Sequence, residues 1–273
     1  NIFPSISEAV SAAEPDASVG VRNAPDIDSR ISINKPLTLS GFEGKPSISV
    51  TTDQEGGEDE AIAIESDNVT IQNLDLNYDG LNRGNDTHLI SGIGRKGITL
   101  RSLEIKSNAS YDTNAIDIRG VDLEIINNVV TDAGIQVQHG SASSSGGSVT
   151  ISGNSVTESE DGGGGILSEG ITAFTLSSVG LSNFTYTIKE NQVRGSDAQA
   201  IKLTDLSSDS PETPADVNGE SDKQDQIEAL LRDNDVFSAR IEGLSGGSNG
   251  AQVTSGSTFN TIQGAVDNAA AGS

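Results

Sequence analysis

The chain has 273 residues, enough for one large domain or two ordinary ones, and it contains no cysteine, which excludes disulfides and thiolate metal sites. Its 16 Lys and Arg residues against 40 Asp and Glu residues give a formal net charge of -24. This charge excludes nucleic acid and anionic membrane surfaces as partners. The lack of an apolar run of about 18 residues excludes a membrane span within the sequence.

The first predicted element is a short amphipathic helix over residues 5–13. Its apolar residues recur at helical spacing on one face, at Ile6, Ala9, Val10 and Ala13. Ser5 is suited to cap the N-terminus, Glu8 follows three residues later, and Pro15 helps to end the helix. Because a stack of open coils exposes an apolar cross-section at each end, we assign residues 1–22 to an N-terminal capping helix and first strand.

An eight-residue string recurs along the chain at intervals of 25 to 43 residues. Its first and third positions are mostly aliphatic and its second is mostly Thr, which is typical of a strand with β-branched residues on the outer face. After a two-residue break the apolar phase resumes. The copies are VTIQNLDL (69–76), ITLRSLEI (98–105), LEIINNVV (123–130), VTISGNSV (149–156) and YTIKENQV (186–193), with a partial copy LTLSGF (37–42) and a poorer one ALLRDNDV (229–236).

A second, shorter string accompanies several copies and leaves no room for crossover helices, which excludes an α/β sheet. It reads AIAI (61–64), AIDI (115–118), GIQV (134–137) and AIKL (200–203). Because the same strings return in the same phase, we favour stacked coils with equivalent strands in parallel register, about 4.8 Å apart, over a hairpin sandwich. We assign residues 23–245 to these coils, with loop insertions at 138–148, 157–165 and 204–226.

Position six of the longer string becomes asparagine in the last four copies, at Asn128, Asn154, Asn191 and Asn234. Asparagine tolerates the left-handed backbone that a sharp bend requires, and stacked amides can hydrogen-bond along a column. We therefore predict that these four residues form a structural asparagine ladder. A ligand site in the same column is the alternative.

With the motifs V-T-I-x-x-N-x-V and A-I-x-I, residues 3–245 resemble the right-handed parallel β-helix repeat proteins, the pectate-lyase-like superfamily in its broad sense. The resemblance implies an all-β fold, a right-handed parallel β-helix or solenoid with short amphipathic capping helices. It leaves the activity open, because the superfamily includes lyases, hydrolases, epimerases, phage tailspikes, adhesins and surface repeat modules.

The segment 246–273 is predicted to be a linker followed by a second capping-type helix. Phe259, Ile262, Ala265, Val266 and Ala269 repeat Phe3, Ile6, Ala9, Val10 and Ala13 at a constant offset of 256 residues. Either this helix caps the last coil or it begins the next unit of a tandem array. We favour the second interpretation, which predicts copies joined head to tail and makes self-association or neighbouring repeats the expected partners.

Enzymes of this fold place carboxylates with an Arg, Lys or His on the outward face of neighbouring coils. Aligning the shorter strings puts Asp117 beside Gln136 and Arg119 beside Gln138, with His139 just beyond, so Asp117, Arg119 and His139 are the catalytic candidates if the chain is an enzyme. The alternative is an exposed ion pair of little energetic consequence. We commit to no metal site.

Calcium is the one cofactor candidate in the sequence, because carboxylate oxygens suit this ion. Glu158, Glu160 and Asp161 would supply them, but no EF-hand loop is present. We therefore expect no cofactor, and solvated acidic side chains explain the same residues.

The acidic residues are spread along the whole chain, as in the surface proteins of extreme halophiles. Such a chain is suited to high salt, because salt of about 1 M shortens the Debye length to about 3 Å and screens the repulsion between the acidic residues.

Glycosylation sequons begin at Asn68, Asn85, Asn108 and Asn183.

Together these features predict a secreted or cell-surface structural and adhesive module, adapted to salt, that assembles into a stalk, filament or surface layer. A lyase or glycoside hydrolase acting on an acidic polysaccharide is one alternative. A glycan-binding adhesin is the other, although aromatic residues make up only 3% of the chain.

Overall fold

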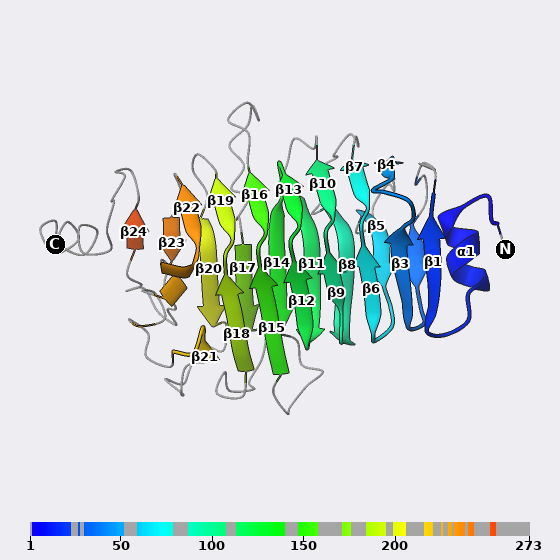
Figure 1. The fold of residues 1–273 in the computed structure, drawn as a ribbon. Helices are drawn as coiled ribbons and strands as arrows, with labels where there is room; N and C mark the ends of the chain where they lie inside the picture. Colours follow the sequence, from blue (N-terminus) through cyan, green and yellow to red (C-terminus); the bar gives the residue numbers. More distant parts are fainter. Residues whose placement is uncertain are drawn as a thin grey trace, which may run out of the picture.

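The chain forms a β-solenoid in which strands stack into three sheets along one axis (Figure 1). The computed structural model describes residues 2–22, 27, 30–51, 59–78, 87–107, 113–139, 147–157, 171–175, 184–194, 199–205, 216–220, 225, 229–230, 232–237, 240–242 and 252–254. Within the three sheets all strand pairs are parallel except β23 with β24. The parallel solenoid predicted from the repeats is therefore confirmed.

The strands fall into an eight-stranded, a seven-stranded and a nine-stranded sheet. In order, the eight-stranded sheet contains β1 (Ala17–Val21), β3 (Leu37–Gly41), β6 (Val69–Gln72), β9 (Thr99–Arg101), β12 (Leu123–Ile126), β15 (Gly147–Ser152), β18 (Phe184–Lys189) and β21 (Asp216–Val217). The seven-stranded sheet contains β4 (Ser47–Val50), β7 (Asp75–Tyr78), β10 (Glu104–Ser107), β13 (Val129–Thr131), β16 (Ser155–Thr157), β19 (Gln192–Arg194) and β22 (Asp235–Phe237). The nine-stranded sheet contains β2 (Ile31–Ile33), β5 (Asp59–Ile64), β8 (Thr87–Lys96), β11 (Thr113–Val121), β14 (Gly134–His139), β17 (Ile171–Thr175), β20 (Gln199–Asp205), β23 (Arg240–Glu242) and β24 (Gln252–Thr254).

The repeat explains this arrangement. Each eight-residue string supplies a strand of the eight-stranded sheet, then a tight bend, then a strand of the seven-stranded sheet, whereas the shorter strings form the nine-stranded sheet. Third-position residues of successive copies are in register and buried, as in the column Leu39, Ile71, Leu100, Ile125, Ile151 and Ile188. The apolar core is therefore a set of aliphatic columns that run along the solenoid axis.

The N-terminal end of the solenoid is covered by helix α1 (Ile6–Ala12), which lies beyond β1 (Figure 1). The Glu8 backbone N–H donates to the Ser5 side chain at 3.1 Å, so Ser5 is the N-cap. Ile6 and Val10 are buried against the first coil. Lys35 Nζ donates to the carbonyls of Ser11 and Ala13 at 2.9 Å each and ties the C-terminal end of the helix to the sheet.

The bend inside the string corrects one expectation. The left-handed residue is at position five, not at the position-six asparagine, with φ between 55° and 66° at Asn73, Ser102, Asn127, Gly153 and Glu190. A side chain at Gly153 would collide with Oδ1 of Asn127, which explains glycine in that copy. The bend at position five leaves position six buried in the corner, where Leu74 and Leu103 occupy the earlier coils.

The predicted loop insertions overlap the ends of several strands. The insertion assigned to 138–148 overlaps β14, which ends at His139, and β15, which begins at Gly147. The insertion at 157–165 begins at the last residue of β16, and that at 204–226 begins inside β20. The rest of these insertions is largely outside the described residues, as is the second capping-type helix.

Candidate functional site

The outer face of the nine-stranded sheet carries a buried row. Ile62, Ile90 and Ile116 form an inward column, and the adjacent column of Ala63, Ser91 and Asp117 is in register beside it on the outer face. All six residues are buried. Outward residues of the other two sheets are mostly exposed or half-buried, so this part of the surface is exceptional.

Asp117 is the centre of this row, with 2% of its surface exposed. Its Oδ2 atom accepts a hydrogen bond from Arg119 Nη2 at 3.3 Å. The same oxygen lies 3.5 Å from His88 Nε2 on the neighbouring strand β8. A buried carboxylate is stabilised when cationic or donor groups face it, so Arg119 and His88 together explain how Asp117 is accommodated. The Arg119 side chain is 32% exposed and reaches the surface.

A second buried carboxylate lies two strands away. Glu60 in β5 is in register with His88 in β8, and 7% of its surface is exposed. Arg30 Nη2 is 3.0 Å from Glu60 Oε2 and 3.0 Å from Glu65 Oε1. Only the contact with Glu65 has hydrogen-bond geometry. Across β5, β8 and β11, a carboxylate, an imidazole and a second carboxylate therefore follow one another, with Arg30 beside the first and Arg119 beside the last.

Several polar atoms on β5, β8 and β11 are buried without a hydrogen-bond partner. Among the described side chains, they are Glu60 Oε2, His88 Nδ1, Arg95 Nε, Asp117 Oδ1 and Arg119 Nε. An unpartnered buried polar atom costs about 1–3 kcal/mol. Four of the five atoms belong to the group around Asp117, where Arg30 at 3.0 Å compensates Glu60 in part, and Arg95 lies seven residues along β8 from His88; such a concentration of unpartnered polar atoms occurs at functional sites.

The structure brings together two of the three catalytic candidates. Asp117 is in register with Gln136 and Arg119 with Gln138, as the string alignment predicts. His139 ends β14 beside Thr175, and its side chain is outside the described part of the structure. The histidine in contact with Asp117 is His88.

Sequence reasoning missed His88, although a signal for it exists. The segment His88-Leu-Ile is a degenerate copy of the shorter string, equivalent to Glu60-Ala-Ile and Asn114-Ala-Ile. Extending the alignment by one residue on the N-terminal side puts Glu60, His88 and Asn114 in one column, and the register confirms this column.

The arrangement has the elements of acid–base chemistry. Asp117 faces one ring nitrogen of His88, and the other nitrogen has no hydrogen-bond partner among the residues that the structure describes. The 3.5 Å contact with Asp117 is not a hydrogen bond and the other ring nitrogen is buried, so proton transfer to a substrate would require this group to become accessible. Among the described residues, no group of three or more His, Asp or Glu side chains is arranged to hold a metal ion. The calcium candidates Glu158, Glu160 and Asp161 are outside these residues.

The asparagine column is saturated with hydrogen bonds. Asn128 Nδ2 donates to Asn154 Oδ1 at 3.0 Å, and the same contact is repeated from Asn154 to Asn191 at 2.9 Å and from Asn191 to Asn234 at 2.8 Å. Each of these Nδ2 groups also donates to a backbone carbonyl, and each of these Oδ1 atoms also accepts a backbone N–H. No group of Asn154 or Asn191 is left for a ligand, which favours the structural role.

Two other surface features carry polar side chains. A hollow between α1 and β2 is lined by Ser7, Ser11, Arg30, Ser32, Asn34 and Lys35. Arg30 and Lys35 already make hydrogen bonds to protein groups, so the hollow is polar but has little unpaired positive charge for a ligand.

The sequon residue Asn68 is exposed and has φ 57°; Asn85, Asn108 and Asn183 are outside the described residues.

Comparison of the chain with protein-family models, with curated proteins and with solved structures finds no match. In the part of the chain that the structure describes, no helix is long and apolar enough to cross a membrane.

Proposed function

We propose that this chain is a secreted or cell-surface structural module, adapted to high salt, whose copies assemble into a stalk, filament or surface layer. The observation that supports the proposal is the continuous stack of three parallel sheets, with the buried asparagine ladder along one corner. In such a stack each coil is bonded to the next by backbone hydrogen bonds and by a packed core. This construction resists bending and extension, which a spacer requires.

The ends of the stack limit how copies join. Helix α1 covers the N-terminal end and contacts β1 and β2, with Ile6 and Val10 buried beneath it. Direct addition of a strand from another copy to this end is therefore blocked. In a head-to-tail arrangement, the outer surface of α1 would contact the end of the preceding copy. Such an arrangement suits units that are joined covalently in tandem.

Salt adaptation follows from the charge of -24. At low ionic strength the acidic residues repel one another, whereas in salt of about 3 M their repulsion is screened within a few ångströms. We expect the melting temperature to rise between dilute buffer and about 3 M KCl, and the sedimentation coefficient to rise with protein concentration in high salt. A melting temperature that does not change with salt contradicts the adaptation, and a monomer in every condition contradicts assembly.

A second candidate function is favoured by the cluster around Asp117. Here Arg119 would face an acidic polysaccharide at the surface, and His88 beside Asp117 would transfer a proton once local opening made its buried ring accessible. Incubation with polyuronates would then release reducing ends or unsaturated products. Activity lost in His88→Gln and Asp117→Asn, and kept in the control His139→Gln, supports this candidate. Absence of turnover by the wild-type chain contradicts it.

A further inference from the structure

The outer face of the eight-stranded sheet differs from the rest of this acidic molecule. Two outward columns run along it, which we name the hydroxyl face. The first contains Ser18, Thr38, Thr70, Thr99, Glu124, Thr150 and Thr187. The second contains Gly20, Ser40, Gln72, Arg101, Ile126, Ser152 and Lys189.

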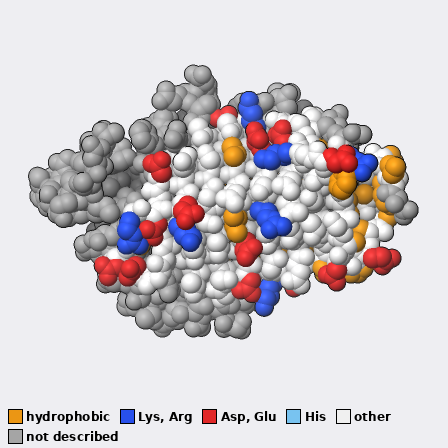
Figure 2. Space-filling view, in the orientation of Figure 1, with side chains coloured by type: hydrophobic (Ala, Val, Ile, Leu, Met, Phe, Trp, Pro, Cys, Tyr) orange, Lys and Arg blue, Asp and Glu red, His pale blue; other side chains and the backbone are white. Residues whose placement is uncertain are grey.

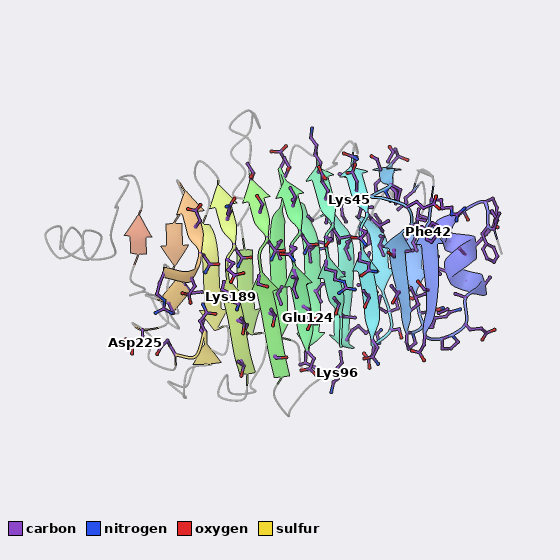
Figure 3. The ribbon with its side chains drawn as sticks, in the orientation of Figure 1. Phe42, Lys45, Lys96, Glu124, Lys189 and Asp225 are labelled. Atoms are coloured by element: carbon purple, nitrogen blue, oxygen red, sulfur yellow. The ribbon has the colours of Figure 1, made fainter. Side chains whose placement is uncertain are left out.

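The hydroxyl face is nearly free of acidic groups. Glu124 is the one acidic residue in strands β1, β3, β6, β9, β12, β15 and β18, and the eighth strand of the sheet, β21, adds Asp216 beyond the two columns, although the chain has 40 acidic residues. Arg101 and Lys189 are the basic residues there, so the two columns carry a formal charge of +1 (two positive, one negative) on a chain of -24. Figure 2 shows red and blue side chains, several of them adjacent, scattered over a mostly white surface on the side that carries this sheet, and Figure 3 labels Glu124 and Lys189.

The face is also open and its hydroxyls are largely unused. None of its residues is buried. Thr99 Oγ1 donates to Glu124 at 3.3 Å, and Ser40, Gln72 and Arg101 are linked in a short chain at 3.2 and 2.6 Å. Within the described part of the chain, the side chains of Thr38, Thr70, Thr150 and Thr187 make no hydrogen bond.

We propose that the hydroxyl face is the surface through which two copies of this chain associate side by side, an inference that rests on the proposed assembly function. Two chains that each carry -24 repel least where the acidic residues are fewest. When the same face meets itself in a two-fold arrangement, Glu124 of each copy can lie opposite one of the two basic residues, Arg101 or Lys189, of the other. Salt screens the repulsion between the remaining acidic surfaces, so the pairing strengthens in high salt.

The size of the face sets the strength of the pairing. Seven strands at about 4.8 Å spacing and five residues at about 3.3 Å rise cover roughly 500 Å² per copy, or about 1,000 Å² in total. This is the lower limit for a specific interface, so a single pair is weak. Copies held in an array gain from effective concentration, because each contact makes the next one intramolecular. Threonine methyl groups supply apolar contact between the columns, as in a stacked β interface.

The test compares two double variants with the same chemistry on different sheets. Thr70→Glu with Thr150→Glu puts acidic groups on the hydroxyl face. Thr131→Glu with Thr157→Glu puts them at half-buried outward positions of β13 and β16 in the seven-stranded sheet. Sedimentation equilibrium of the full chain in about 3 M KCl measures association, and circular dichroism melting shows that each variant is folded.

We expect the hydroxyl-face variant to lower the association constant at least about tenfold, which corresponds to about 1.4 kcal/mol, and the control to change it less than about twofold. Association that falls equally in both variants, or in neither, overturns the hydroxyl face as the interface but leaves assembly standing. A wild-type chain that stays monomeric overturns both. Binding of a soluble neutral glucan by a monomeric wild type, lost in the hydroxyl-face variant, would identify the face as a glycan surface and overturn self-association.

Discussion

The outer faces of the eight-stranded and nine-stranded sheets belong to the same coils, yet they differ in burial, charge and regularity. The hydroxyl face is open, nearly uncharged and regular, with Thr or Ser in most positions of its first column. The outer face around Asp117 is buried and charged, and it is irregular from one coil to the next. Inward columns are aliphatic beneath both faces. The interior therefore sets the fold, and the outward columns are free to serve assembly on one side and polar chemistry on the other.

The largest expected effect is in the asparagine ladder, at the corner where the eight-stranded and seven-stranded sheets meet. Asn154→Leu keeps the branched shape of the side chain but removes the hydrogen bonds that Asn128 and Asn191 make with it, and it leaves the Ile125 carbonyl without its amide donor. We expect a loss of about 4 kcal/mol in the free energy of unfolding, because each orphaned group costs about 1–3 kcal/mol. Urea denaturation measures it.

The reverse substitution, Leu103→Asn, is the control. Leu103 precedes Asn128 in the same column, and its backbone N–H already donates to Asn128 Oδ1 at 3.0 Å. An amide at this position extends the ladder by one coil, so the loss should be clearly smaller than for Asn154→Leu. Equal losses from the two variants would show that the ladder contributes nothing beyond packing.

The next prediction compares the effects on stability of one substitution on each of the two outer faces. Asp117→Asn removes a buried charge that faces Arg119 and His88, and we expect a loss of about 2 kcal/mol, reduced from the usual cost of a broken buried pair because Arg119 reaches solvent. Thr150→Val on the hydroxyl face should stay within about 0.5 kcal/mol. Urea denaturation of both variants measures the contrast, and equal losses would mean that the two faces do not differ energetically.

The smallest effect is at the edge of the eight-stranded sheet, at Asp122. Partial burial raises the pKa of Asp122, but the hydrogen bond from the Ser148 backbone N–H at 3.2 Å and the ion pair with Lys96 at 3.3 Å outweigh it and hold the pKa below its ordinary value. A carboxyl whose pKa is lower in the folded state stabilises the fold above its unfolded pKa, near 3.9, and this contribution is lost as the pH falls through the folded value.

We therefore expect Asp122→Asn to flatten the acid limb of the stability curve below about pH 4 and to leave the slope near neutrality unchanged. Asparagine tolerates the φ of 54° at this position, so the backbone is not strained by the change. The free energy of unfolding measured against pH checks this. A wild-type slope retained in the variant would show that Asp122 has no part in it.

The sequence predicted the inner half of the molecule well and the outer half poorly, for a physical reason. Inward residues such as Ile71 and Ile125 meet the same environment in every coil. An aliphatic residue therefore recurs at the same position of each string, and the register of the strands can be read from the string alignment. The bend could not be placed to the residue, because Asn, Ser, Gly and Glu all occupy position five and the left-handed φ leaves no single signature there.

The cluster around Asp117 was predicted only in part because it does not repeat. The Asp117–Arg119 pair lies within one strand and follows from alternation. His88 belongs to a coil whose string, Leu-Ile-Ser-Gly, departs from the A-I-x-I pattern, so its contact with Asp117 appears only in three dimensions. The charge contrast of the hydroxyl face likewise needs the register, because its residues are 20 to 37 positions apart in the sequence.

The most direct test of assembly as the function of this chain is electron cryo-microscopy of the wild-type protein at high concentration in about 3 M KCl. We expect ordered arrays in which copies pack with their eight-stranded sheets facing one another. Isolated particles in every field, at all salt and protein concentrations, would contradict the account.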